Sequence, residues 1–229
     1  MKSKKRTLLE IYDKLYAFYG PQHWWPGDSP FEVAVGAILT QNTNWSNVEK
    51  AIANLKAARV LSARALHRLP AAELALLIRP SGYFNMKAGR LKAFLAFILT
   101  IYSGSMKRMG KGDTASLRQE LLNVHGIGPE TADSILLYAL DKPVFVIDAY
   151  TKRVMSRHGI LDRGASYDEY QLMFHELLGN NIRLFNEYHA LLVMVGKDYC
   201  KPKPLCANCP LTQLLDNKMD KGVGQLHFC

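Results

Sequence analysis

The sequence predicts an all-α protein, and three observations support this fold class. Apolar residues recur three and four positions apart along most of the chain, which is the period of a helix with one buried face. Proline and glycine punctuate these segments, as they do at helix ends. Only 144–147 reads as an extended apolar run, and four residues do not make a sheet. The 229 residues, 48% of them hydrophobic, suffice for one sizeable core or two lobes.

The first half of the chain is divided by clear start and stop signals. Apolar and aromatic residues from Leu8 to Tyr19 form one helical stripe that ends at Gly20. Ser29 and Pro30 suit the N-cap and first turn of a helix that ends near Gln41. Further helices are expected over 46–58, 62–69, 71–78 and 88–102, and the small, basic stretch 103–112 is expected to be a loop.

The stretch from Leu122 to Gly159 is the centre of the predicted organisation. A tight turn at 125–128 contains Gly126 and Gly128, and a helix opens behind it at Pro129. A helix N-terminus behind glycines points backbone N–H groups outward, which predicts a site for a nucleic-acid phosphate. Asp148 follows the extended run at the N-cap position of a helix over 149–158, and two more helices are expected over 167–178 and 182–199.

Charge and cysteine content narrow the class of protein. The formal net charge of +9 and the pI of about 9.4 favour a polyanionic partner. No run of 18 apolar residues and no apolar signal segment occurs, so we expect a soluble protein of the cytoplasm. The four cysteines crowd toward one end of the chain, which in a reducing compartment suggests a metal or cluster before disulfides.

Several motifs in this order resemble those of the helix-hairpin-helix DNA glycosylases of the endonuclease III superfamily. The hairpin motif spans 126–132, and the motif around Asp148 spans 146–154. The segment 39–43 resembles that family's glutamine motif, and Gly82-Tyr83 with Lys87-Ala88 resembles its next landmark. The resemblance covers nearly the whole chain.

The resemblance implies two helical lobes with a DNA cleft between them. A six-helix barrel that includes the helix-hairpin-helix would span 26–134, and the second domain would combine 1–25 with 135–229 and the cysteine loop. The implied activity is excision of a damaged or mispaired base that is flipped out of double-stranded DNA, by a monomeric enzyme. A non-catalytic DNA-binding module is the alternative from another class.

Asp148 is the predicted catalytic residue. In the family that it resembles, the matching carboxylate supports loss of the base by stabilising positive charge on the sugar or by orienting the attacking water. A plain N-cap is the simpler interpretation of an isolated Asp, but the Gly-rich hairpin upstream favours catalysis.

Glu130 departs from one branch of the family. Bifunctional members carry a lysine at this position, whose amine forms a Schiff base with the sugar and permits strand cleavage. A carboxylate forms no imine, so the resemblance implies a monofunctional glycosylase without lyase activity. Lys142 and Lys152 lie nearby in sequence, but neither matches the motif. An endonuclease III-like lyase remains an alternative.

Tryptophans suggest the substrate. Trp24, Trp25 and Trp45 are predicted to form a stacking pocket for a flipped base, together with Glu130. Indole faces attract a cation, which suits positively charged methylated purines such as 3-methyladenine. This pattern resembles the 3-methyladenine DNA glycosylase III branch. The alternatives are ordinary core tryptophans, or a glycosylase for mismatched adenine or for thymine and uracil.

Other residues are predicted to hold the DNA. Gln41 would fill the gap left by the flipped nucleotide, because its amide both donates and accepts hydrogen bonds. The backbone at Gly126 and Gly128 would grip a phosphate, helped by Lys152 or by the arginines that follow it.

The cysteine spacing differs from the family pattern. Cys200, Cys206 and Cys209 give a first interval one residue short of the family's cluster loop, and Leu215 stands where the fourth ligand is expected. Cys229 is the only replacement. Four thiolates would suit a [4Fe–4S] cluster, which we expect; zinc, or a loop without metal, is the alternative.

Overall fold

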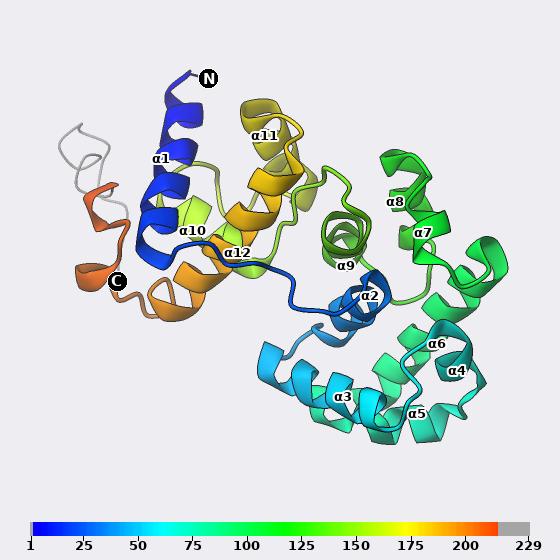
Figure 1. Ribbon diagram of the computed structural model, residues 1–229. Coiled ribbons are helices and arrows are strands. Elements are labelled where there is room, and N and C mark those ends of the chain that lie inside the picture. Colours follow the sequence, from blue (N-terminus) through cyan, green and yellow to red (C-terminus); the bar gives the residue numbers. More distant parts are fainter. Residues whose placement is uncertain (1, 215–229) are drawn as a thin grey trace. The chain divides into compact units, whose positions relative to one another are not determined.

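The computed structural model describes residues 2–214 and separates the chain into two compact units (Figure 1). One, here called the central unit, spans Trp25–Pro143. The other, the terminal unit, joins Met1–Trp24 to Val144–Cys229 and is described over 2–24 and 144–214. Every regular element within residues 2–214 is helical, so the all-α prediction is confirmed.

The central unit is built around α2 (Pro30–Leu39), which is buried on every side from Glu32 to Leu39. A helix that is apolar all round belongs in the middle of a core, and the sequence of α2 has this composition. The long helix α6 (Phe84–Tyr102) packs against α2. The remaining elements are α3 (Trp45–Ala57), α4 (Ala63–Arg68), α5 (Ala71–Leu77), η1 (Arg79–Ser81), α6 (Phe84–Tyr102), α7 (Met106–Met109), α8 (Thr114–Leu122), α9 (Pro129–Ser134) and a π-helical turn η2 (Ile135–Ala139).

The terminal unit packs helices from both parts of its sequence. The ring of Phe145 stacks on Phe174 with centroids 3.7 Å apart, and Tyr188 donates its hydroxyl to the Leu8 carbonyl at 2.7 Å. The latter bond joins α12 to α1, so the first helix is an integral part of this core. The elements are α1 (Lys2–Tyr19), α10 (Ala149–Arg157), α11 (Tyr167–Leu178), α12 (Ile182–Asp198) and η3 (Cys206–Asn208).

The helices α10, α11 and α12 of the terminal unit begin at the predicted residues, and each has a side-chain cap. The side chains of Asp148, Ser166 and Asn181 accept hydrogen bonds from the first turns of α10, α11 and α12. Each cap satisfies a backbone N–H that has no partner within its helix. The three helices therefore begin where the sequence predicts.

One prediction is corrected, and the predicted domain limits differ from those of the two compact units. The stretch 103–112 is not all loop, because Ser105 caps the short helix α7, whose Met106 and Met109 are buried. The predicted domain boundary at residue 135 falls inside a continuous helical segment, since α9 runs into the buried turn η2. The division between the units lies instead at 143/144, and at 24/25 near the start of the chain.

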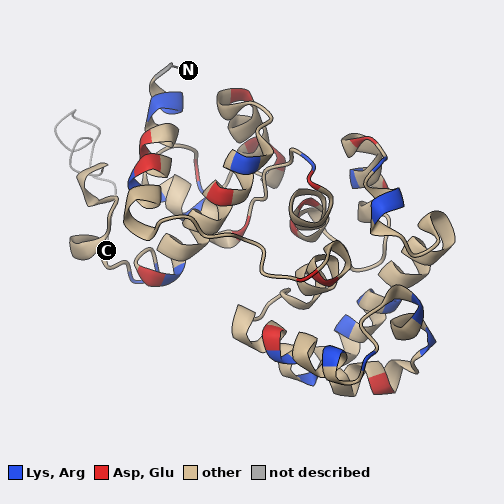
Figure 2. Cartoon of the chain, viewed as in Figure 1, with Lys and Arg blue, Asp and Glu red and all other residues tan. Residues whose placement is uncertain are grey.

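Basic residues are distributed over both units. Lys and Arg lie on helices of both units (Figure 2), consistent with the excess of 29 basic over 20 acidic residues. Among the residues that the structure describes, no helix is both long and apolar enough to cross a membrane.

Candidate active site

Asp148 lies at the start of α10, where its side chain has two distinct roles. One carboxylate oxygen, Oδ1, accepts the backbone N–H of Thr151 at 2.7 Å and caps the helix. The other, Oδ2, lies 3.6 Å from Nε2 of His189, which α12 supplies. Only 11% of the Asp148 side chain is exposed. The residue is therefore both an N-cap and a buried carboxylate with a side-chain partner.

Opposing effects act on the pKa of Asp148. Burial is the largest and raises the pKa, because it penalises the charged form. The contact with His189 and the hydrogen bonding from Thr151 act in the other direction, and the net result is a pKa below the usual value of 3.8. Asp148 is consequently a carboxylate at neutral pH, although it is mostly shielded from water.

The hairpin in the central unit has the two glycines in different conformations. Gly126 has φ of +81°, the left-handed region that side chains rarely adopt. Gly128 has an extended backbone, forms the N-cap of α9 without a side chain, and has no heavy atom within 4 Å of the place where a Cβ would stand. Open space beside a helix N-terminus allows close approach of a ligand. Glu130 is exposed in the first turn of this helix.

Gln41 is tied to the hairpin by its amide. Its Nε2 donates to the Gly126 carbonyl at 3.0 Å and to Oγ1 of Thr131 at 2.9 Å. Its Oε1 accepts a hydrogen bond from Nη1 of Arg90. The predicted DNA-contacting residues Gln41 and Gly126 are thus in direct contact.

An aromatic cluster forms in the central unit. The rings of Trp25 and Trp45 meet edge to face at 5.2 Å, and Trp25 lies 5.3 Å from Tyr138 in η2. Gly36 of α2 provides the room, because a Cβ there would stand 3.2 Å from Nε1 of Trp25. Trp24 belongs to the terminal unit, where Nζ of Lys197 lies 5.9 Å from its ring centroid. The structure therefore groups Trp25 with Trp45, and adds Tyr138.

Basic residues of α10 are engaged within the terminal unit. Lys152 donates to the Ala165 carbonyl at 3.0 Å and lies over the ring of Tyr170. Arg153 donates to the carbonyls of Cys200 and Gly196. A phosphate would have to replace these partners before either side chain could bind it.

The cysteine loop is fastened to α10 by Arg157. Its guanidinium donates to the carbonyls of Lys201 and Pro202 at 2.6 and 2.9 Å, and to Sγ of Cys200 at 3.3 Å. Cys200, Cys206 and Cys209 line one small cavity. Burial raises the pKa of the Cys209 thiol, against the opposing effect of a backbone hydrogen bond at Leu211, and the neighbouring Cys200 and Cys206 add to the rise.

Three thiols around one cavity supply the donor chemistry of an iron–sulfur or zinc site. Within residues 2–214, however, no three His, Cys, Asp or Glu side chains are arranged as a metal-binding group. Cys229, the predicted fourth ligand, lies outside the described residues.

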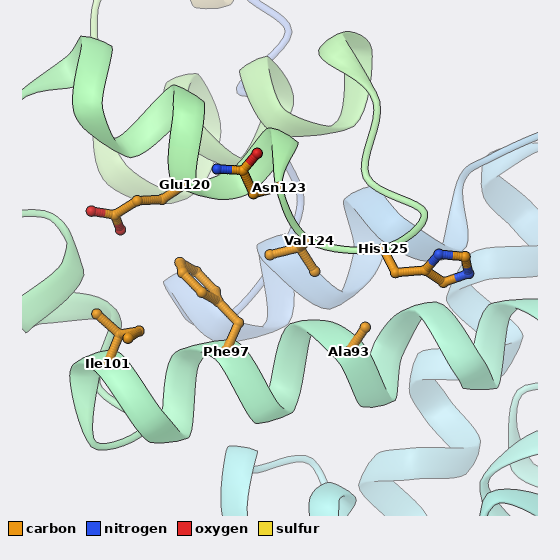
Figure 3. Close-up of a pocket in the computed structure, with 7 residues that line it drawn as sticks. All are labelled: Ala93, Phe97, Ile101, Glu120, Asn123, Val124 and His125. Atoms are coloured by element: carbon orange, nitrogen blue, oxygen red, sulfur yellow. The ribbon is translucent and has the colours of Figure 1, made fainter.

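A groove of about 480 Å³ runs beside the hairpin in the central unit (Figure 3). One wall is α6, with Phe97 and Ile101, and the other runs from Glu120 of α8 to His125 of the hairpin. None of the predicted site residues lines this groove, and the carboxylate of Glu120 accepts a hydrogen bond from the Tyr102 hydroxyl. We therefore do not assign base excision to it.

Two residues of this constellation were missed in the sequence. His189 lies on the buried face of α12, and a polar residue at an apolar position of a helical pattern is the signal that could have marked it. Arg90 carries no local signal, because its contact with Gln41 joins residues 49 positions apart. Both act through partners that are remote in sequence.

Comparison with known proteins identifies the family. The model of the HhH-GPD superfamily of base excision DNA repair proteins matches residues 35–179. A candidate DNA repair glycosylase of Methanocaldococcus jannaschii is 47% identical over 218 residues, which cover 94% of this chain and 99% of that protein.

Solved structures agree. The H. pylori 3-methyladenine DNA glycosylase bound to 1,N6-ethenoadenine matches with a TM-score of 0.74 and 30% identity, over 85% of this chain and 97% of that one. An endonuclease III–DNA complex matches with a TM-score of 0.78 over 95% and 98% of the two chains; at 21% identity this shows the fold. The chain belongs to the HhH-GPD superfamily and is a base-excision repair DNA glycosylase with the helix-hairpin-helix fold of endonuclease III.

Proposed function

We propose that this glycosylase is monofunctional and hydrolyses the N-glycosidic bond of an alkylated purine, such as 3-methyladenine, that is flipped out of duplex DNA. The observation that carries the proposal is the buried carboxylate of Asp148, with a pKa below its usual value, at the start of α10. The family in which it occurs removes bases, and the hairpin of this chain has Glu130 in place of a lysine amine, which favours hydrolysis over lyase chemistry.

Asp148 lowers the barrier to loss of the base. As the glycosidic bond breaks, positive charge develops on the sugar, and an ionised carboxylate beside it stabilises that charge. Little solvent screens the interaction, because the side chain is mostly buried. Water then attacks the sugar, and the reaction leaves an abasic site.

Glu130 supports the absence of strand cleavage. A lyase needs an amine that attacks the sugar and forms an imine, and Glu130 stands at the position of the family's lysine. Lys152 does not replace it in this structure, since its amine is bound to Ala165 and stacked over Tyr170.

The aromatic cluster supports the choice of substrate. A methylated purine with positive charge stacks favourably on indole rings, and Trp25 with Trp45 offers two of them. Such a base is already a good leaving group, so one carboxylate suffices. The H. pylori enzyme, at 30% identity, is named for 3-methyladenine. Glu130, in the same unit, is the further residue of the proposed pocket.

DNA is held in this proposal by the backbone at Gly126 and Gly128, by Gln41 and by Lys152. The open space at Gly128 supports the phosphate contact. We further propose that the enzyme acts as a monomer on genomic DNA inside the cell.

The test is an excision panel. Duplexes containing 3-methyladenine, 7-methylguanine, uracil, thymine glycol, or adenine opposite 8-oxoguanine are incubated with the protein, and released bases are quantified. We expect the methylated purines to be released fastest, with intact strands until alkali is added and no covalent complex after borohydride. Fastest release of uracil or mispaired adenine would overturn the substrate, and efficient borohydride trapping would overturn the monofunctional assignment.

We also propose that the cysteine loop holds a [4Fe–4S] cluster, with Cys200, Cys206, Cys209 and Cys229 as the four ligands. The cluster would supply a structural cross-link to the loop that Arg157 fastens to α10. Protein purified without oxygen should contain iron and sulfide, and Cys229→Ser should lower both. A protein with bound zinc or no metal, or a Cys229→Ser variant with unchanged iron, would contradict this.

A further inference from the structure

The amide of Gln41 is almost fully used within the free protein. Both of its N–H groups are donated, to the Gly126 carbonyl and to Thr131 Oγ1, and its oxygen accepts from Arg90. An amide has two donors and one oxygen with two lone pairs, so only one lone pair remains. A side chain whose sole task is to enter DNA has no need of these bonds.

Arg90 contacts the hairpin directly as well as through Gln41. A Cβ on Gly126 would stand 2.3 Å from Cγ of Arg90 and 2.7 Å from its Cδ. The aliphatic part of Arg90 therefore lies against the Gly126 backbone, at the residue whose φ is +81°. Packing and hydrogen bonding converge on the same peptide.

The helix that carries Arg90 is itself fixed to the same region. Lys87 lies one turn earlier on the same face of α6, is 1% exposed, and donates to the carbonyls of Leu39 and Ser81 at 2.8 and 2.6 Å. Leu39 is the last residue of α2, two positions before Gln41. Beyond Arg90, α6 runs beside the hairpin (Figure 3). One face of α6 therefore contacts both the end of α2, which leads into Gln41, and the hairpin turn at Gly126.

We propose that Gln41 and Arg90 are positioning residues for the phosphate-binding hairpin, which they hold in its DNA-binding conformation before any base is flipped. The inference rests on the proposed function in that the hairpin binds phosphate. This role differs from that of a wedge, a side chain that fills the gap left by the flipped nucleotide. A wedge acts only after the nucleotide has left the duplex, whereas a positioning residue acts before. Backbone N–H groups bind an anion best when the turn is already ordered.

The first test measures affinity for an undamaged duplex by fluorescence anisotropy. Arg90→Met keeps the aliphatic packing on Gly126 and removes the donor to Gln41. We expect Gln41→Ala and Arg90→Met each to weaken binding about tenfold, as loss of a hydrogen bond to a charged group would. The double variant should be no weaker than either single one, because both break the same connection.

Two controls accompany this test. Arg64→Met removes the charge of an exposed arginine on α4 and should change affinity far less. Arg90→Lys keeps the aliphatic stem and the charge and should restore most of the affinity. Unchanged binding of undamaged duplex by Gln41→Ala, with weaker binding only of abasic duplex, would overturn the proposal and leave Gln41 as a wedge alone.

The second test needs no DNA. The Ile127 amide donates to the Val124 carbonyl at 3.1 Å inside the hairpin, and its hydrogen exchange reports how often the turn opens. Exchange should be faster in Gln41→Ala and Arg90→Met than in the wild type or Arg64→Met, at equal melting temperatures. Unchanged exchange would overturn the positioning role. A protein that excised no base yet showed both effects would refute the proposed function alone.

Discussion

Asp113 and Asp148 occupy the same local position in two helices. Each is an N-cap with extended backbone, and each accepts a backbone N–H three residues ahead, at 3.0 Å from Ser116 and 2.7 Å from Thr151. The pKa of both carboxyl groups lies below the usual value. By local structure alone the two residues are equivalent.

Their surroundings separate them. Asp113 is exposed, and its pKa is lowered chiefly by hydrogen bonds from Ser116. Asp148 is mostly buried, so that burial raises its pKa, and the contact with His189 and the bonds from Thr151 outweigh that effect. The comparison teaches that a capping carboxylate becomes a candidate catalyst when a tertiary partner keeps it ionised away from water.

The largest expected effect separates the two caps by activity. Asp148→Asn keeps the size of the side chain but removes its charge, and excision should fall by about 10³-fold or more while DNA binding persists. Asp113→Asn, the matched control in α8, should excise at the wild-type rate. Single-turnover release of base from a methylated duplex measures both. Near wild-type turnover by Asp148→Asn would remove the distinction between the caps.

A smaller effect tests the partner that distinguishes Asp148. In His189→Leu the contact at 3.6 Å is lost, and burial should raise the pKa of Asp148. In the wild type this pKa lies below 3.8, so excision should depend on Asp148 protonation only below that pH. In the variant the acidic decline in rate should move to higher pH. An identical pH–rate profile would show that His189 does not act through the carboxylate.

The lowered pKa of Asp148 also makes folding stability depend on pH. A carboxyl group whose pKa is lowered by folding stabilises the protein above its unfolded pKa, and that contribution is lost as pH falls through the folded pKa. For Asp148 this loss should begin near pH 3.8 in the wild type, and in His189→Leu, where the folded pKa lies closer to or above the unfolded one, the loss should be smaller or absent. Thermal unfolding at a series of pH values measures it.

The smallest effect concerns Asp113 as a cap alone. Asp113→Ala removes the acceptor for the Ser116 N–H and should lower the melting temperature by about 2 to 4 °C, with excision unchanged. Calorimetry beside the excision assay separates the two quantities. A loss of excision at constant melting temperature would show that Asp113 has a role beyond capping.

The sequence by itself determined the features that depend on neighbouring residues. The helices α10, α11 and α12 begin at their capping residues, and the turn at Gly126 needs a residue that tolerates positive φ. These signals are local, because a cap or turn is satisfied within four residues. The family motifs around Gly126 and Asp148 could be read for the same reason.

Only the tertiary structure decided which residues work together. The pairing of Asp148 with His189, the connection of Gln41 to Arg90, and the fastening of Cys200 by Arg157 each join different helices or loops. Tyr138 joins the aromatic cluster from the π-helical turn η2, which the spacing of apolar residues in the sequence does not predict. Such contacts depend on how buried faces pack, and many side chains would satisfy the same apolar pattern, so the sequence pattern does not specify them.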